Sequence, residues 1–315
     1  MPSRRAKSGR RDNAGSNAAP VHAAARRMPS RRHLLLAAAA AVLSGAVWWS
    51  ATRAPAAEIR READQNVLLI TIDTLRADAL GAYGGRARTP RLDALAARGV
   101  RYDFAHAHAV LTLPSHASIL TGRYPFEHGI RDNSGYRLRD GEPTLASLLK
   151  QAGYATGAFI GAFPLDARFG LSQGFDVYDD RLAENLASAD FVIAERPAGD
   201  VVAAARQWIS AQQGRWFSWV HVFDPHAAYA PPPPYDREYA DSPYHGEVAY
   251  TDRALGTLFD AVAASGRPTL VVVTSDHGEA LGDHGELTHG LFACESTLRV
   301  PLIVPQLPAA GAGGR

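Results

Sequence analysis

Five short apolar segments, each bounded by turn-forming residues, recur along the chain. Their length and continuous hydrophobicity are typical of strands buried on both faces of a parallel sheet. They are 66–72, 154–160, 216–222, 269–275 and 300–304. Segments with helical patterning lie between them: Pro90–Arg98, Pro114–Leu120, Pro143–Ala152, Asp200–Gln212 and Gly246–Ala263. This alternation predicts an α/β fold, a three-layer α/β/α sandwich around a mostly parallel sheet.

Residues 1–57 differ from the rest in charge and hydrophobicity. They carry ten Arg or Lys residues and one Asp, and no charge occurs in 34–51. Arg31-Arg32 before this stretch resembles a twin-arginine export signal, and Ala54-Pro55-Ala56 offers a cleavage site. We therefore expect an exported protein, either periplasmic or anchored to the inner membrane through 34–51 and facing outward. The predicted segments are a basic disordered tail at 1–32, a signal peptide or anchor at 33–57 and a linker at 58–65.

The rest of the chain is acidic, although the formal net charge of the whole is +1. It holds 23 basic and 31 acidic residues. Nucleic-acid binding relies on clustered basic groups, so we expect no nucleic-acid partner. Cys294 is the only cysteine, which excludes an intrachain disulfide. We predict one catalytic domain over 66–307 and a disordered end over 308–315.

Polar side chains directly follow two of the predicted strands. Asp73 comes after 66–72, and Asp276-His277 comes after 269–275. Ligand sites of parallel sheets lie at the carboxyl ends of the strands. Thr112 lies at a loop-to-helix junction, where a helix N-terminus supplies positive potential. Two carboxylates, an imidazole and a hydroxyl suit a divalent cation that activates Thr112 as a nucleophile.

Several polar residues admit both a functional and a structural interpretation. Thr112 itself is a candidate helix cap, the usual role of a threonine at such a position. His221 lies within an apolar strand, where a satisfied core histidine is at least as expected as a catalytic one. Asp224 could join His226 and His289 in a second metal site, although we favour one metal. Other candidates for contacts to substrate oxygens are Asn133 and His116.

These motifs resemble, in order, those of the sulfatase branch of the alkaline phosphatase superfamily. The matching stretches between Asn66 and Val304 are Leu69–Asp78, Gly81–Gly84, Thr89–Asp93, Thr112–Pro125, His128-Gly129, His221–His226, Ser275–Glu279 and Arg299–Leu302. The resemblance implies an alkaline phosphatase-like fold and metal ligands Asp73, Thr112, Asp276 and His277. It also implies that Thr112 is the nucleophile and that substrate oxygens are bound by Asn133, His226 and His289.

Two positions depart from the main type of this family. That type has a cysteine or serine at position 112, later oxidised to formylglycine, and an arginine at position 116. Threonine cannot become formylglycine, so no formylglycine-generating enzyme is expected as a partner. A sulfated threonine cannot release sulfate by collapsing to an aldehyde, whereas a phosphothreonine is readily hydrolysed. Thr112 therefore favours phosphate or phosphonate esters, with Thr112, His116 and His226 as the predicted catalytic residues.

Three functions stay open at this point. The first is a hydrolase of small-molecule, glycan or lipid esters of phosphate, phosphonate or sulfate. It would need one divalent ion (Ca, Mn or Zn) and possibly a second. The alternative is an envelope transferase of the phosphoglycerol or phosphoethanolamine type that retains 34–51 as an anchor. The third is a truncated inactive member acting as a binding module, because His116 replaces arginine and we expect the C-terminal subdomain of the family to be absent.

Overall fold

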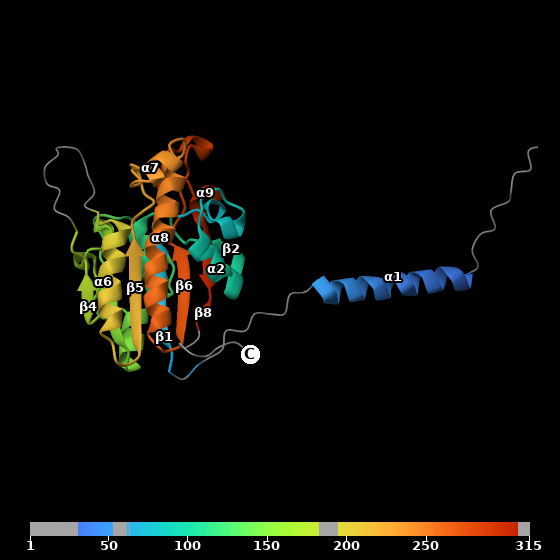
Figure 1. Ribbon diagram of the computed structural model, residues 1–315, viewed down its shortest axis with the longest axis horizontal. Coiled ribbons are helices and arrows are strands. Elements are labelled where there is room, and N and C mark those ends of the chain that lie inside the picture. Colours follow the sequence, from blue (N-terminus) through green and yellow to red (C-terminus); the bar gives the residue numbers. More distant parts are fainter. Residues whose placement is uncertain (1–30, 53–61, 63, 183–194, 308–315) are drawn as a thin grey trace, which may run out of the picture. The chain divides into compact units, whose positions relative to one another are not determined.

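The computed structural model describes residues 31–52, 62, 64–182 and 195–307 (Figure 1). The chain divides into two compact units, Met1–Ala56 and Ala57–Arg315. In the first unit, α1 (Arg31–Thr52) covers most of the predicted signal or anchor segment. None of the helices described is long and apolar enough to span a membrane. Most of the predicted tail and linker, and the end at 308–315, lie outside the described residues, so export stays a prediction.

The second unit is built on one mixed sheet. Its strands are β1 (Asn66–Ile72), β2 (Val100–His106), β3 (Ala155–Phe159), β4 (Val177–Asp179), β5 (Trp216–Val222), β6 (Thr269–Ser275), β7 (Arg299–Val304) and β8 (Gln306–Leu307). The strand order is β2-β7-β6-β1-β5-β3-β4, and β8 pairs with β6. The strands β6, β1, β5, β3 and β4 are parallel, which confirms the mostly parallel sheet.

The prediction for 300–304 was wrong in direction. This segment is a strand, but β7 runs antiparallel to both β6 and β2. A parallel neighbouring strand needs a crossover connection that returns the chain to the end of the sheet where the first strand begins, usually through a long helix. Between β6 and β7 the only α-helix described is the single turn α9 (Glu295–Leu298). The chain therefore re-enters the sheet at the same end at which β6 leaves it, and β7 runs back antiparallel to β6.

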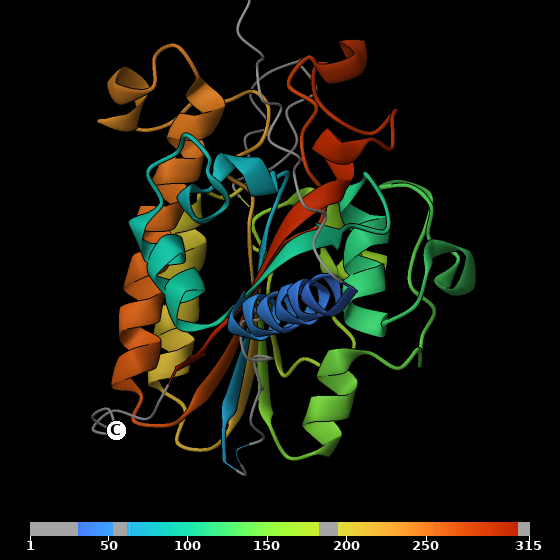
Figure 2. The same ribbon diagram turned by 90° about the vertical axis from the view of Figure 1, so that its right-hand side faces the viewer.

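Helices cover both faces of the sheet, as the predicted three-layer sandwich requires. The longer α-helices of this unit are α2 (Pro90–Arg98), α3 (Thr112–Thr121), α5 (Leu145–Gln151), α6 (Ala198–Ser210) and α8 (Pro243–Ala264). Short α-helices are α4 (Pro125–His128), α7 (Tyr235–Glu238) and α9, and 3-10 turns lie at Ala77–Ala79, Gly81–Tyr83, Phe163–Leu165, Ala167–Phe169 and Asp283–Gly285. Seen edge-on, the orange α8 and yellow α6 lie on one side and the green α3 and α5 on the other (Figure 2).

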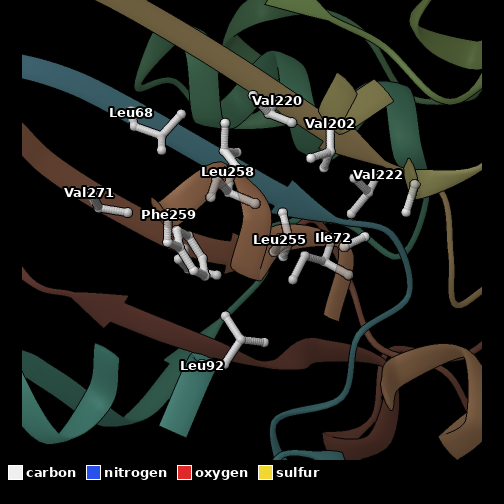
Figure 3. Packing of buried hydrophobic residues seen from close by; sticks show 14 of the residues in the cluster. Leu68, Ile72, Leu92, Val202, Val220, Val222, Leu255, Leu258, Phe259 and Val271 are labelled. Carbon is white, nitrogen blue, oxygen red and sulfur yellow. The ribbon is translucent and has the colours of Figure 1, made fainter. Parts of the chain in front are cut away.

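Each layer boundary has its own apolar core because side chains alternate along the strands. On β5, Val220 and Val222 join the core shared with α6 and α8, whereas Phe217 and Trp219 join the core shared with α3 and α5. In the first core, Leu255 and Leu258 of α8 pack against the sheet (Figure 3). By the same alternation, His221 faces the α3 layer, where the site is found.

Candidate functional site

Three of the predicted metal ligands converge at one end of the sheet. Asp73 follows β1 and Asp276-His277 follows β6, and these neighbouring parallel strands pair Ile72 with Ser275. One ligand atom of each of the three residues lies within 4.8 Å of the others. All three side chains are completely buried. Both oxygens of Asp73, Oδ2 of Asp276 and Nε2 of His277 have no hydrogen-bond partner among the described residues.

Such a cluster of unpaired polar atoms is costly unless something binds it, because a buried polar atom without a partner loses its hydration. A divalent cation fits this donor set of two carboxylates and one imidazole. Burial and the nearby carboxylate of Asp73 raise the pKa of Asp276 well above its usual range. Burial lowers the pKa of His277 to about 3, so its imidazole is neutral. Nδ1 of His277 lies 3.0 Å from the carbonyl oxygen of Gly278, which leaves the Nε2 lone pair for a cation.

The hydroxyl of Ser275 ties the two strand ends together. Its oxygen lies 2.6 Å from the carbonyl oxygen of Ile72 and accepts the N–H of Leu75 at 3.0 Å. The same hydroxyl contacts the carbonyl of His277. Thr74, directly after Asp73, adopts a left-handed backbone with φ 51°, which is uncommon for a residue other than glycine. These contacts fix the position of both carboxylates relative to one another.

Thr112 is the first residue of α3 and is almost completely buried. Helix α3 begins two residues earlier than the sequence pattern predicts, so Leu111, not Thr112, is the cap residue. The interpretation of Thr112 as a mere helix cap is therefore wrong. Ser115, one turn into the helix, donates its hydroxyl to the carbonyl of Asp276. This contact holds the N-terminus of α3 beside the predicted metal ligands.

His116 lies beneath Thr112 and is completely buried. Its Nδ1 is 2.7 Å from the carbonyl oxygen of Thr112 and 3.6 Å from Oδ2 of Asp276. Its Nε2 is 3.0 Å from the hydroxyl of Thr71. Burial lowers the pKa of His116 to about 3, which leaves the imidazole neutral. The structure thus places His116 behind the helix N-terminus, in contact with Asp276.

The three predicted substrate-binding residues are held by different elements. Asn133 accepts the N–H of Leu113 through its Oδ1 at 2.8 Å, which leaves its amide N–H groups to bind other acceptors. The ring of His226 stacks on Phe223 with centroids 4.1 Å apart. The ring of His289 lies 4.4 Å from that of His277 and 5.2 Å from that of His226. Asn133 therefore lies at the start of α3, and His226 and His289 continue the row of imidazoles that begins at His277.

The structure does not bring Asp224, His226 and His289 together as the second metal site that the sequence left as the less favoured alternative. Within the described part of the chain, these three are not among the groups whose ligand atoms converge. Asp224 instead accepts the N–H of Ala198 at 2.8 Å. It lines, together with His226 and Glu247, a cavity of about 190 Å³. Asp224 therefore satisfies the first N–H group of α6.

His221 is a polar residue of the site that the sequence analysis left undecided. It is completely buried on β5, and Thr71 of β1 lies opposite it in the sheet. Its Nε2 lies 3.3 Å from Oδ2 of Asp73. Neither ring nitrogen makes a hydrogen bond to any described residue, so His221 is not a satisfied core histidine. The one signal in the sequence is an imidazole near the end of an apolar strand, and that signal is ambiguous without the register of the sheet.

Glu247 of α8 holds the loop that carries His226. It accepts the N–H of His226 at 3.1 Å and that of Ala230 at 2.6 Å. The side chain is nearly completely buried. Burial raises the pKa of Glu247 to about 8 from an ordinary value of 4.5. The folded protein therefore holds a proton on this group that the unfolded chain releases at lower pH.

We expect the free energy of unfolding to fall as the pH rises through about 8. The folded-state pKa of Glu247 is raised, so the stability it contributes is present at low pH and is lost as the carboxyl ionises. Urea unfolding at pH 6 to 9 should show this decline in the native chain and a flatter profile for Glu247→Gln. Glu238→Gln, at an exposed position of α7, is the matched control. Equal slopes in all three proteins would contradict the assignment.

Comparison with known proteins gives a consistent result over the second unit. A sequence model of the sulfatase family matches residues 65–306. The uncharacterized sulfatase YidJ of Escherichia coli K12 is 25% identical over 315 aligned residues, which cover 76% of this chain and 62% of that protein. Human arylsulfatase D is 44% identical over 103 residues, which cover 29% of this chain and 17% of that protein.

The fold also has close structural neighbours. The crystal structure of the phosphonate monoester hydrolase of Agrobacterium radiobacter matches with a TM-score of 0.62 and 22% identity, over 76% of this chain and 68% of that one. The aligned part amounts to less than two thirds of each of the two curated relatives. The family model nevertheless spans most of the chain and all strands of the sheet except the last residue of β8. The chain therefore belongs to the sulfatase family.

Proposed function

We propose that this protein is a metal-dependent hydrolase of phosphate, phosphonate or sulfate esters that uses Thr112 as its nucleophile. The observation that carries the proposal is the set of buried, unpaired ligand atoms of Asp73, Asp276 and His277 beside the first turn of α3. The sulfatases and phosphonate monoester hydrolases among the similar proteins support an ester hydrolase.

A divalent cation bound by Asp73, Asp276 and His277 would lower the pKa of the threonine hydroxyl and neutralise substrate oxygens. The oxygen of Thr112 attacks the phosphorus or sulfur atom, and the bond to the ester oxygen breaks. The proton that the hydroxyl of Thr112 gives up is balanced by the one that the departing alcohol takes up. Water then attacks the phosphorus or sulfur atom, which returns the hydroxyl of Thr112 and releases the acid. The N-terminus of α3 and the amide of Asn133, which bonds to it, would stabilise the charge that develops on the non-bridging oxygens.

The identity of the nucleophile supports phosphate and phosphonate esters over sulfate esters. Release of sulfate from a threonine ester requires attack by water at sulfur, because threonine has no second hydroxyl that would expel it. Phosphothreonine is hydrolysed by attack at phosphorus in the same site. We therefore expect aryl phosphate diesters or phosphonates to be turned over faster than aryl sulfates.

The experiment is a panel of 4-nitrophenyl phosphate mono- and diesters, phosphonates and sulfates, assayed with the chelator-treated chain. Mn²⁺, Ca²⁺ or Zn²⁺ is added back separately, and release of nitrophenol is followed. Turnover that requires an added cation and favours the phosphorus esters supports the proposal. Metal-independent turnover, or no turnover of any ester with any cation, would reject it.

Replacing Asn133 by alanine should affect both stability and turnover. The N–H of Leu113 loses its acceptor, which costs about 1 kcal/mol as for a helix cap. The loss of an amide donor to the substrate should lower kcat by a factor on the order of 10². Asn133→Asp separates the two effects, because it keeps the acceptor for Leu113 and with it the stability, whereas the donor is replaced by a negatively charged oxygen. If Asn133→Asp retained native kcat, the substrate contact would be excluded.

A further inference from the structure

The carboxylates of the metal centre each lie between imidazoles on two sides. Oδ1 of Asp73 is 3.8 Å from Nε2 of His277, whereas Oδ2 of Asp73 is 3.3 Å from Nε2 of His221. Oδ2 of Asp276 is 3.4 Å from Nε2 of His277 and 3.6 Å from Nδ1 of His116. Each carboxylate therefore faces His277 on one side and an imidazole of the α3 layer on the other.

A cation held by Asp73, Asp276 and His277 leaves His221 without a partner. Both ring nitrogens of His221 are buried and unpaired with respect to the rest of the described chain. One ligand atom each of His116, His221 and Asp276 falls within 4.8 Å of the others, as a group separate from the one that contains His277. The candidate ligand atoms thus fall into two sets that share Asp276.

These distances suit ligands of a common ion. With metal–ligand bonds of about 2.1 Å, two ligands at angles near 90 to 110° lie roughly 3.0 to 3.4 Å apart. His221 lies within this range of Asp73 at 3.3 Å, and His116 lies slightly above it from Asp276 at 3.6 Å. The ligand atoms of His116, His221 and Asp276 all lie within 4.8 Å of one another, so they would move closer together on binding. An imidazole-rich set with one carboxylate is typical of Zn²⁺ and also accepts Mn²⁺.

We propose that His116, His221 and Asp276 bind a second divalent cation, with the carboxylate of Asp276 bridging the two ions and that of Asp73 within reach of both. The proposal rests on the metal centre of the proposed function but not on its reaction. The two carboxylates carry two negative charges, which one divalent ion only neutralises. A second ion leaves net positive charge for the oxygen of Thr112 and the substrate, as in two-metal sites with ions about 3.5 to 4 Å apart.

The hydrogen bonds of His116 permit this role in one tautomer. In the structure the carbonyl oxygen of Thr112 lies 2.7 Å from Nδ1 and can only accept, so Nδ1 carries the hydrogen and Nε2 accepts the hydroxyl of Thr71 at 3.0 Å. Binding of the cation at Nδ1 requires the hydrogen to move to Nε2, which then donates to the hydroxyl oxygen of Thr71 beside the indole N–H of Trp219. A threonine oxygen has two lone pairs and can accept both. Nδ1 of His116 then presents a lone pair toward Asp276, with the carbonyl oxygen of Thr112 beside it as a further ligand. The second ion would lie directly under the first turn of α3.

The test is metal stoichiometry, measured on the full chain without any turnover. The chain is stripped with a chelator, titrated with Zn²⁺ by calorimetry, and analysed for bound metal by mass spectrometry. We expect two ions per native chain and one for His221→Phe, a variant that fills the space and removes the unpaired nitrogens. His277→Ala should also lose one ion. His128→Phe, which replaces another buried imidazole outside the cluster, should keep two.

A second readout uses Mn²⁺ and electron paramagnetic resonance. Two neighbouring Mn²⁺ ions are magnetically coupled, so the six-line signal of the native chain should weaken at two equivalents and persist in His221→Phe. One ion per native chain, or two ions retained with coupling in His221→Phe, overturns the proposal. The native stoichiometry decides the matter even if a variant does not fold. Because binding is measured directly, the result is independent of whether any ester is hydrolysed.

Discussion

Thr112→Ala is expected to lower kcat for every ester substrate by a factor between about 10⁴ and 10⁶, the loss seen when a nucleophile is removed and only binding and electrostatic effects remain. Thr112 is the first residue of α3, and its neighbour Ser115 is bonded to the backbone of Asp276. In the first turn of α3, the hydroxyl of Ser115 is already bonded to a carbonyl, whereas Thr112 directly follows the cap residue Leu111. Steady-state release of nitrophenol, with the cation that best supports the native chain, measures the effect.

A matched control is available on the same helix. Thr121, at the end of α3, bonds its hydroxyl to the carbonyl of Ala117 and lies away from the helix N-terminus. Thr121→Ala should keep kcat within about threefold of native, a change of less than 1 kcal/mol in the activation barrier. Thr112→Ser should retain part of the activity, because it keeps the hydroxyl. Native-like turnover by Thr112→Ala would remove the nucleophile assignment and leave the metal centre untouched.

Removal of the cation is expected to destabilise the folded protein strongly. The ligand atoms of Asp73, Asp276 and His277 are buried and unpaired in the described structure, so a bound ion supplies partners that no side chain provides. At a free cation concentration 1,000 times Kd, binding adds about 4 kcal/mol to the free energy of unfolding. For a domain of this size that corresponds to a rise in Tm on the order of 10 °C. Thermal unfolding with chelator and with added Mn²⁺ or Zn²⁺ measures it.

Asp73→Asn should abolish most of this rise in Tm. In the presence of chelator the same variant should be at least as stable as the native chain, because it removes one of two buried like charges. Asp140→Asn is the control, since Asp140 is exposed and paired with Arg137. A Tm that does not respond to chelator in the native chain would show that these carboxylates hold no ion.

Local patterns predicted most of the fold. The strands β1, β5 and β6 have the predicted bounds, because continuous apolar runs of that length fit only the interior of a sheet. The helix α3 begins two residues before the predicted start at Pro114, because its cap residue is Leu111, which carries no capping side chain and therefore gives no signal in the sequence. The direction of β7 was missed because an apolar run has the same pattern in either direction.

The site was predicted as far as it follows from strand ends. Asp73 and Asp276-His277 come directly after predicted parallel strands, which places all three at the same end of the sheet. That these two strands are neighbours and bring the three side chains together is shown by the structure. The hydrogen bond of Asp224 could not be predicted from the sequence, because its partner, the N–H of Ala198, belongs to a helix 26 residues away in the chain. The role of Glu247 could not be predicted either, because its two hydrogen-bond partners, His226 and Ala230, lie on a loop outside α8.

The amino-acid sequence by itself determined the five main apolar strands, the longer helices between them, the family motifs and the three candidate metal ligands, because each depends on short-range pattern. The short strands β4 and β8 and the edge strand β2 were not predicted. Only the tertiary structure decided which imidazoles face those carboxylates. His221 becomes part of the site because β5 pairs with β1 in a register that sets it opposite Thr71, and His116 because α3 packs on that face of the sheet. Buried polar atoms without a hydrogen-bond partner arise where distant segments of the chain pack together, so only the folded structure reveals them.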